Sequence, residues 1–234
     1  MRIIVSLLLL LAIPSFAQQP IPSAQELLSR VRANEAHQHH DLVGQLKVSS
    51  VSRSLKIPFR LTMRPGEITY SFTNPNESLV LRLDGDQSQL YRTDAWGRST
   101  PITGSRLDGT VRGTDITYED LALKFLYWND ARVVKTGTAM TRKCWIVEVK
   151  PPRKNTSQYD RAELWIEKSG ALLRADCFAN GKLVKRFEVR TAQKVNGGYI
   201  LKSMRIQSLG DEGRDSTPTL LEVQPVAAAR GENR

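Results

Sequence analysis

From about residue 42 onward apolar and polar residues alternate, and this period of two constrains the fold more than any other feature. Such alternation predicts β-strands that bury one face. Turn-forming pairs such as Pro65-Gly66 and Asp84-Gly85 separate the runs. The predicted strands span residues 42–50, 55–63, 67–73, 78–83, 88–93, 132–138, 143–150, 161–168, 171–178, 182–191, 199–208 and 217–223.

The pattern predicts about 11–12 strands and only two helices. This indicates a mainly β fold built on a strongly curved antiparallel sheet or barrel. A flat sheet of that width would leave long edges open to pairing with other chains. No internal repeat or low-complexity tract divides the chain, so a single domain is the simpler interpretation.

The strands between residues 143 and 178 have the best-specified register, because a two-residue turn at Ser169-Gly170 sets Glu167 opposite Leu172. One face then carries apolar rows and the other a row of carboxylates. Apolar rows can line either a core or a lipid-sized cavity, and periodicity does not distinguish the two. The apolar rows are Trp145/Ile166/Leu173, Val147/Leu164/Ala175 and Val149/Ala162/Cys177, and the acidic row is Glu148/Glu163/Asp176.

Residues 24–36 are predicted to form an amphipathic helix before the first strand. Ser23 can cap this helix, and Glu26 completes the pattern of a capping box. Three apolar residues share one face and can pack on the sheet. They are Leu27, Leu28 and Val31.

A second helix is predicted within residues 113–128, GTDITYEDLALKFLYW. Thr117 can cap it, with Asp120 completing another capping box. The carboxylates of its first turn also favour the positive end of the helix dipole. Three large apolar residues share one face and can cover the mouth of a curved sheet as a lid. They are Leu121, Phe125 and Trp128.

Residues 113–121, GTDITYEDL, resemble the Gly-Ser/Thr-Asp-x-[aromatic or polar]-Tyr-x-Asp-Leu signature of the outer-membrane lipoprotein-sorting (LolA-like) family. The later segments KCWIVEVKP, YDRAELWIEKSGALLRADCF and GKLVKRFEV are similar to the second half of that family. The upstream segment LYRTDAWGRSTPITGS departs from the family pattern, because it is polar and lacks a proline-rich hydrophobic stretch. The positions that carry the motif are Gly113, Asp115, Tyr118, Asp120 and Leu121.

The resemblance implies an unclosed antiparallel β-barrel whose helices form a lid over a hydrophobic cavity. It also implies periplasmic binding or transfer of lipid-modified proteins or other acylated cargo. Residues 18–224 are then one LolA-like β half-barrel domain, followed by a flexible tail at residues 225–234. The cavity and lid are expected at Leu121, Phe125, Trp128, Trp145, Val147, Leu164, Ile166 and Leu173.

Residues 1–17, MRIIVSLLLLLAIPSFA, have the pattern of a cleaved secretory signal peptide. One early charge precedes an apolar run, and the segment ends in the small-x-small sequence Ser15-Phe16-Ala17. The run is too short for a spanning helix, although an uncleaved anchor is the alternative. We expect a soluble periplasmic protein that begins near Gln18.

The chain is basic, with 34 Lys and Arg residues against 24 Asp and Glu residues, and loss of Arg2 with the signal peptide leaves a formal charge of +9. Nucleic acid is a usual partner for such a charge. Here, however, the charges alternate with apolar residues along strands, and the protein is expected to be exported. An anionic membrane surface or an acidic partner is the better fit, and no nucleic acid is expected.

Cys144 and Cys177 are expected to be free thiols, because the inferred register places them on opposite faces and too far apart for a disulfide. His37, His39 and His40 lie at a helix-to-strand junction without three or four convergent ligands. We expect that junction to be solvated and to hold no metal.

The sequence contains no nucleophile elbow, phosphate-binding loop or His-Glu metal helix. The acidic row is expected to be neutralised by Lys150, Arg161 and Arg174, and its alternative is a site for a cation or a basic partner. We therefore expect a protein without enzymatic activity and without a cofactor.

These patterns predict a monomeric periplasmic carrier, or chaperone, that binds the acyl chains of lipoproteins or other lipids during outer-membrane lipoprotein transport. Each buried methylene contributes roughly 0.8 kcal/mol, so a single chain would be held reversibly. A partner protein at the inner or outer membrane would exchange the cargo. The alternative is an envelope sensor or adaptor that uses the same fold to bind a protein partner.

Overall fold

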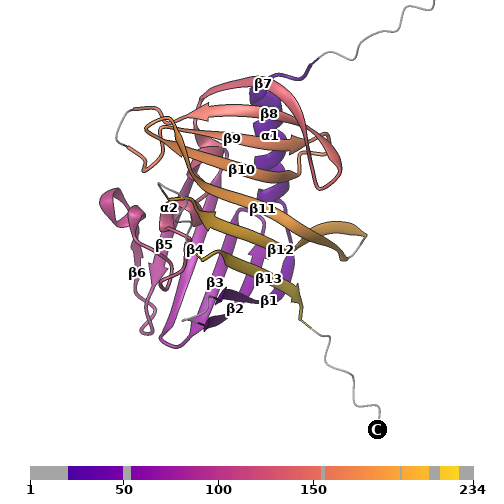
Figure 1. Ribbon diagram of the computed structural model, residues 1–234. Coiled ribbons are helices and arrows are strands. Elements are labelled where there is room, and N and C mark those ends of the chain that lie inside the picture. Colours follow the sequence, from indigo (N-terminus) through magenta and orange to yellow (C-terminus); the bar gives the residue numbers. More distant parts are fainter. Residues whose placement is uncertain (1–20, 50–53, 154–155, 196, 211–216, 227–234) are drawn as a thin grey trace, which may run out of the picture.

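The computed structural model describes residues 21–49, 54–153, 156–195, 197–210 and 217–226. They form one antiparallel sheet of 13 strands in the order β6-β5-β4-β3-β2-β1-β13-β12-β11-β10-β9-β8-β7 (Figure 1). Within these ranges β6 and β7 are the two edges and do not pair, so the prediction of a mainly β, unclosed antiparallel fold is confirmed. The predicted signal peptide and all but the first residues of the predicted tail lie outside the described residues.

Most strands follow the predicted bounds closely, since the turn residues of the sequence mark their ends. The short strand β6 falls in a predicted loop, and β11 continues beyond its predicted end. The strands are β1 (His40–Ser49), β2 (Ser54–Arg64), β3 (Glu67–Thr73), β4 (Asn76–Asp84), β5 (Gln87–Thr93), β6 (Ser99–Pro101), β7 (Asp130–Ala139), β8 (Arg142–Lys150), β9 (Arg161–Glu167), β10 (Leu172–Ala179), β11 (Lys182–Val195), β12 (Gly198–Ser208) and β13 (Thr219–Pro225).

Helix α1 (Ala24–Ala36) precedes the sheet and begins at the predicted cap, but the predicted capping box is incomplete because the Glu26 carboxylate pairs with Arg30 at 2.6 Å. The Ser23 side chain accepts a hydrogen bond from the backbone N–H of Glu26 at 3.1 Å. The predicted apolar face of α1 is buried in the core, with Leu27, Leu28 and Val31 almost inaccessible. No helix in the described ranges combines the length and apolar character needed to cross a membrane.

The predicted register of β8 and β9 is confirmed along their whole pairing. Trp145 lies opposite Ile166, and Val147 lies opposite Leu164. The far end of β9 and β10 also agrees, because Ala162 lies opposite Cys177. The apolar rows therefore face one side of the sheet, where they join the main core.

The turn between β9 and β10 differs from the prediction. It contains three residues, because the backbone N–H of Glu167 donates to the carbonyl of Ala171 at 2.9 Å. Gly170 adopts a left-handed φ of +86°, which glycine tolerates and which a three-residue hairpin loop requires. The extra residue moves Glu167 away from its predicted partner, Leu172.

The predicted register therefore placed Leu173 on the wrong face of the sheet. A bulge between Leu172 and Arg174 absorbs the extra residue, so Leu172 lies opposite Ile166. Leu173 then packs on the other face of the sheet, in a smaller cluster. The buried members of that cluster are Cys144, Ile146 and Trp165.

Neutralisation of the acidic row on the outer face is confirmed. Arg161 lies 2.8 Å from Glu163 and 3.6 Å from Glu148, while Arg174 lies 2.5 Å from Asp176. The weakest predicted partner is Lys150, at 3.8 Å from Glu148. Three further cations, missed in the sequence, also pair with this row: Arg132, Lys135 and Arg186.

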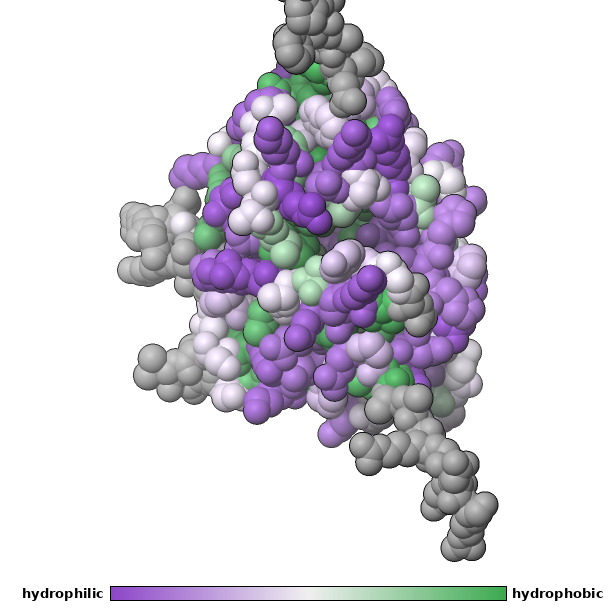
Figure 2. Space-filling view, turned by 90° about the vertical axis from the view of Figure 1, so that its right-hand side faces the viewer, coloured by the Kyte–Doolittle hydropathy of each residue, from purple (hydrophilic) through white to green (hydrophobic). Residues whose placement is uncertain are grey.

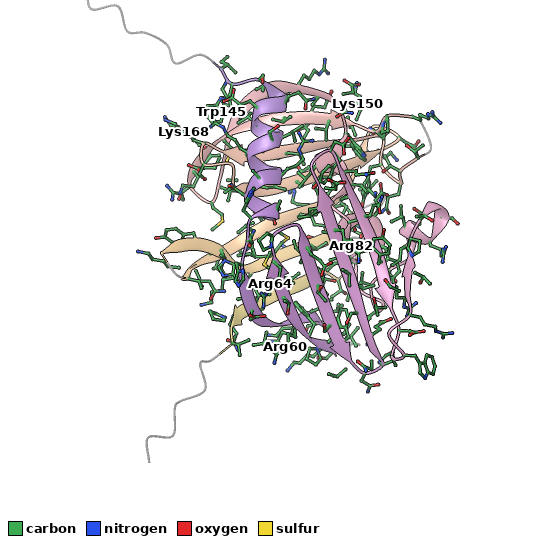
Figure 3. All side chains as sticks on the ribbon, turned by 180° about the vertical axis from the view of Figure 1, so that it is seen from behind. Arg60, Arg64, Arg82, Trp145, Lys150 and Lys168 are labelled. Carbon is green, nitrogen blue, oxygen red and sulfur yellow. The ribbon has the colours of Figure 1, made fainter. Side chains whose placement is uncertain are left out.

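The surface is mostly hydrophilic on the side shown in Figure 2, with apolar residues visible only in patches between polar ones. From behind, Arg60, Arg64 and Arg82 lie on the strands of the first half of the sheet (Figure 3). Arg64 and Arg82 are paired with Asp41 and Glu67. The basic surplus of the sequence is thus spread over outward-facing strand positions.

The opening between the two sheet edges is covered by segments outside the sheet. A short 3-10 helix, η2 (Lys124–Tyr127), contacts β5 near one edge, β8 near the other and α1. Gln25 and Arg32 of α1 hydrogen bond to the carbonyls of Asn129 and Leu126. The apolar face of the curved sheet, α1 and η2 enclose one continuous hydrophobic core.

Candidate functional site

Residues 109–128 link the two halves of the sheet, and the predicted capping box is present in them. The Asp120 carboxylate accepts from the Thr117 N–H at 2.8 Å, and the Thr117 hydroxyl accepts from the Asp120 N–H at 3.2 Å. Helix α2 (Tyr118–Leu121) starts at this box. Gly113, with a left-handed φ of +71°, allows the chain to turn before it.

Asp120 is also the centre of a buried polar network. Its carboxylate accepts from the Lys185 ammonium and from the Tyr159 hydroxyl, each at 2.7 Å. All three residues are at most 5% exposed. Burying two charges costs several kcal/mol of desolvation, roughly offset when pairing and hydrogen bonds are complete, so such a network specifies position more than it adds stability.

Gln158 and Glu119 extend this network. Gln158 donates from its side chain to the Thr117 hydroxyl at 2.7 Å and from its backbone to the Glu119 carboxylate at 3.1 Å. Burial raises the pKa of Glu119 above its usual value. Burial, together with the charge of Asp120, also raises the pKa of Tyr159, which therefore stays a hydrogen-bond donor at neutral pH.

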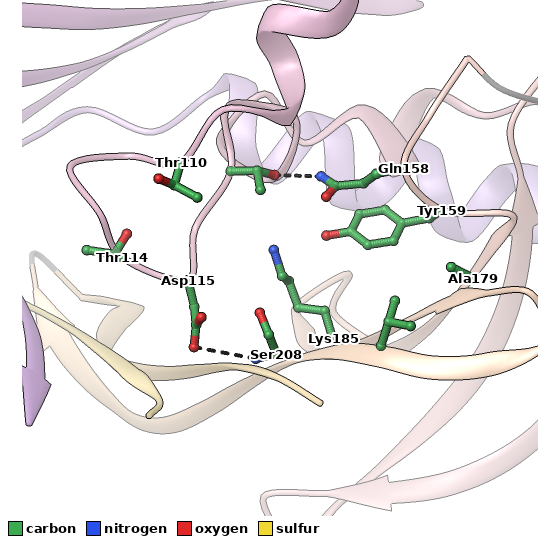
Figure 4. Close-up of a pocket in the computed structure, with 10 residues that line it drawn as sticks. Thr110, Thr114, Asp115, Gln158, Tyr159, Ala179, Lys185 and Ser208 are labelled. Atoms are coloured by element: carbon green, nitrogen blue, oxygen red, sulfur yellow. Dashed lines mark hydrogen bonds between the residues drawn. The ribbon is translucent and has the colours of Figure 1, made fainter. Parts of the chain in front are cut away.

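A polar pocket of about 360 Å³ opens beside the network (Figure 4). Asp115 lies on its wall, where its carboxylate accepts from the Ser208 N–H at 3.5 Å. Most of the lining groups are hydroxyl, amide or charged, including Thr110, Gln158 and Lys185. This chemistry suits a small polar molecule better than an acyl chain.

The predicted lid helix is not continuous. Helix α2 ends at Leu121, Leu123 has a left-handed φ of +52°, and η2 follows. The Ser88 hydroxyl donates to the carbonyl of Ala122 at 2.5 Å, and the Lys124 ammonium donates to the carbonyl of Ser88 at 2.5 Å. These bonds to β5 replace the helical ladder, so packing against the sheet edge outweighs local helix preference.

The apolar residues of this segment reach the core despite the break. Phe125 is 3% exposed, and its ring lies 6.2 Å from that of Phe187 between centroids. Trp128 is also buried, whereas Leu121 is half-buried and packs against the same cluster. The three therefore converge on one core, although they do not form one helical stripe.

The predicted cavity wall lies opposite these residues. Val147, Leu164 and Ile166 are inaccessible members of the main core, and Trp145 is half-buried against it. Leu173 does not belong to the wall, for the reason given above. The structure thus brings the other predicted residues together around one apolar interior.

A second hollow lies on the other side of residues 109–121. This groove has a volume of about 670 Å³, and Thr110 lines both hollows. Its walls combine apolar residues with Arg92, Arg112 and Glu77. Arg112 donates to the backbone carbonyls of Asn74 and Pro75 and pairs with Glu77 at 2.7 Å.

The cysteines lie where the register predicts, as free thiols in separate clusters. Cys144 is buried in the outer cluster and Cys177 in the main core. At the histidine junction, the His37 ring lies 2.7 Å from the Ala33 carbonyl at the end of α1. In the described part of the chain, no group of three His, Cys, Asp or Glu residues is arranged to hold a metal.

Several residues of the polar network and the groove were missed in the sequence, although they share a detectable signal. Lys185 occupies a position in register with the buried Phe187 and Val189 on β11. Glu77 likewise continues the inward-facing row of β4, and Arg92 that of β5. A charge on the apolar face of a strand is costly, so it marks a position with a specific partner.

Solved structures that share this fold include the following three. A DUF1329 family protein from Desulfovibrio piger is 17% identical, with a TM-score of 0.67 over 86% of this chain and 90% of its own. A domain described as an outer membrane lipoprotein-sorting protein, from Vibrio parahaemolyticus, is 15% identical, with a TM-score of 0.67 over 89% and 94%. A LolA superfamily protein from Nitrosomonas europaea is 12% identical, with a TM-score of 0.62 over 89% and 96%.

The chain therefore shares its fold with these proteins. A protein-family model with the description "Uncharacterized protein" matches residues 71–228, more than half of the chain. The chain belongs to this family. No curated protein matches the chain in sequence.

Proposed function

We propose that the protein binds acyl chains reversibly between the apolar face of its sheet and residues 121–128, and that it does so as an exported carrier without chemistry. The observation that carries this proposal is the way the interior is closed. An unclosed sheet of 13 strands has its opening covered by α1 and η2, which belong to neither edge.

In this proposal the segment that covers the interior, residues 117–128, is displaced at one end only. Its start is held by the buried Asp120 network, whereas the buried side chains of its end are apolar. The hydrogen bonds of that end, from Lys124, Arg32 and Gln25 to backbone carbonyls, are part-buried or exposed. Leu123, in the left-handed region, separates the two ends at a cost of roughly 1–2 kcal/mol. A segment with a fixed start and a strained joint can open without unfolding the sheet.

In this proposal an acyl chain lies against the sheet in the place now occupied by the side chains of residues 121–128. These side chains then contact the acyl chain from its other side. Each methylene removed from water contributes roughly 0.8 kcal/mol, so one chain offsets the contacts that the cover loses. The cargo would be a lipoprotein or another acylated molecule in the periplasm, delivered with the help of a membrane-associated partner. The resemblance of the motif and the shared fold support this choice.

The test is titration of the mature protein with a fluorescent long-chain fatty acyl probe. We expect wild-type protein to bind it and Phe125→Ala to bind it about tenfold more weakly, because a ring that contacts the chain is lost. The matched control is Ile146→Ala, which removes a buried side chain from the outer cluster. The control should lose stability and keep its affinity for the probe.

Absence of probe binding by the wild-type protein would contradict the proposal. Capture of one stable protein partner by such a protein would then favour the sensor or adaptor function. Equal loss of affinity in Phe125→Ala and Ile146→Ala would show that the ring acts only through stability.

A further inference from the structure

The groove beside residues 109–121 lies where the apolar face of the sheet changes into a charged one. On β4 the inward row begins with Glu77 and continues with leucines, and on β5 it ends with Arg92 after Leu90. The Arg112 guanidinium lies 4.4 Å over the ring of Phe72, which is buried in the core. Charged groups therefore border the hydrophobic interior directly.

The charges of this groove do not balance. Arg92 and Arg112 both pair with Glu77, at 2.5 Å and 2.7 Å. Lys56 also borders the groove, but on β2 it alternates with the buried Ile57, so its side chain belongs to the outer face. Two cations thus face one carboxylate, so the groove has a formal surplus of one positive charge.

The cations differ in how freely they can reach a ligand. The side chain of Arg112 is only 12% exposed and holds the β3–β4 turn, whereas that of Arg92 is 51% exposed. Arg92 contacts Glu77 through Nε and Nη2, which leaves guanidinium N–H groups for another acceptor. Guanidinium groups bind phosphate and carboxylate oxygens in pairs, so the exposed Arg92 is the natural contact for an anion.

Apolar residues complete the groove. Ile57 is buried and Leu55 half-buried, and both contact the main core. Pro58 and Tyr118 add further apolar surface. A wall of this kind next to unbalanced cations is complementary to an amphiphile whose anionic group is attached to a hydrocarbon chain.

We propose that this groove binds the anionic head group, a phosphate or a carboxylate, of the acyl-chain ligand. This inference rests on the proposed function, which places the acyl chain of the ligand. It adds that the protein prefers ligands with an anionic head group. With its chain against the apolar face of the sheet, the ligand places its head at the charged border, where Arg92 binds it. Arg112 keeps Glu77 in place and prevents this carboxylate from repelling the head.

The experiment compares two probes with the same chain, hexadecyl phosphate and 1-monopalmitoylglycerol, by calorimetric titration of the mature protein. We expect Arg92→Glu to weaken hexadecyl phosphate binding about tenfold or more, because one attraction becomes a repulsion. Binding of the neutral glyceride should change less than about twofold. Raising the salt concentration should weaken the phosphate probe selectively in the wild type.

The matched control is Arg98→Glu, which makes the same charge change at an arginine whose side chain is 74% exposed, on the β5–β6 turn outside the groove. It should leave both affinities unchanged. Arg92→Gln is the second variant, because it removes the charge without adding one, and thermal unfolding of each variant shows whether it is folded.

The outcomes separate the two proposals. If the wild type binds both probes equally and Arg92→Gln changes neither affinity, the head-group site is wrong and the carrier function stands. If neither probe binds, the carrier function itself fails, and the head-group site with it. Inorganic phosphate at the same concentration as hexadecyl phosphate should not compete with it for binding. Competition at equal concentration would identify a free anion as the ligand and overturn the proposal.

Discussion

The two ends of the segment that covers the interior are held by different forces. Around Thr117 and Asp120, hydrogen bonds from Lys185, Tyr159 and Gln158 fix the chain inside the protein. Beyond Leu123 the buried contacts are apolar, made by the side chains that fill the interior, and the hydrogen bonds there are part-buried or exposed. The first kind of contact tolerates almost no displacement, because a separated partner would be left buried and unpaired.

Under the proposed carrier function, this difference lets the covering segment be well placed and still be displaced by a ligand. Apolar contacts are non-directional, so an acyl chain can replace a phenyl or indole ring at little net cost. A buried ion pair cannot be replaced in this way. Under the proposed carrier function, the polar network is the fixed point about which the apolar end would move.

Removal of the fixed point should have the largest effect. Asp120→Ala leaves the Lys185 ammonium buried without its partner, and we expect a loss of about 3–5 kcal/mol in the free energy of unfolding. Urea denaturation measures this loss. The double variant Asp120→Leu with Lys185→Met should recover most of it, and a single variant as stable as the wild type would show that the network does not fix the segment.

The second prediction compares Phe125, in the segment that covers the interior, with Leu164, in the sheet. Leu164→Ala, in the sheet, should cost about 2–5 kcal/mol. Phe125→Ala should cost less than about 2 kcal/mol, because contacts of a locally opening segment stabilise the fold only up to the free energy of opening. Equal losses of 3–5 kcal/mol, measured by urea denaturation, would mean that Phe125 belongs to the permanent core.

A smaller effect is expected at the helix cap. Thr117→Ala removes the acceptor of the Asp120 N–H and of the Gln158 amide, and we expect a loss of about 1 kcal/mol. Thr117→Ser keeps the hydroxyl and should stay close to the wild type in thermal unfolding. Faster amide exchange in residues 118–121 of the alanine variant alone would locate the loosening.

The smallest effect concerns Glu35, near the end of α1. Burial raises its pKa to about 7, so the folded protein holds a proton that the unfolded chain releases near pH 4.5. The stability linked to this group is therefore present below pH 4.5 and is lost as the pH rises toward 7. Glu35→Gln should raise stability at pH 8 by on the order of 1 kcal/mol, a modest value because the side chain is partly accessible, and should have no effect at pH 4.

Features with a local cause were predictable from the sequence. The alternating pattern and its turn residues specify nearly all strand bounds, and the register of β8 and β9 follows from burial of one face. The capping boxes have the same local character, and the one at Thr117 is complete. The convergence of Phe125 and Trp128 on the sheet wall followed from their size and polarity.

Features decided by distant partners were not predictable. Ser88 and Ala122 are separated by 34 residues, and no local pattern announces that their hydrogen bond will interrupt a helix. Leu173 was misplaced because one extra turn residue and one bulge compensate each other over a few positions. Lys185 was detectable as a charge on an apolar row, but its partner Asp120 was not.

The central seam of the sheet has a consequence for the order of folding. Strand β1 pairs with β13, with Leu42 opposite Pro225, so the first and last strands of the described residues are neighbours. Each half of the sheet can assemble from hairpins between consecutive strands, but this seam requires the whole chain and gives the fold a high contact order. Until the last strand has been synthesised, β1 is an open edge that can pair with another chain. Its docking is the step at which aggregation and native folding compete.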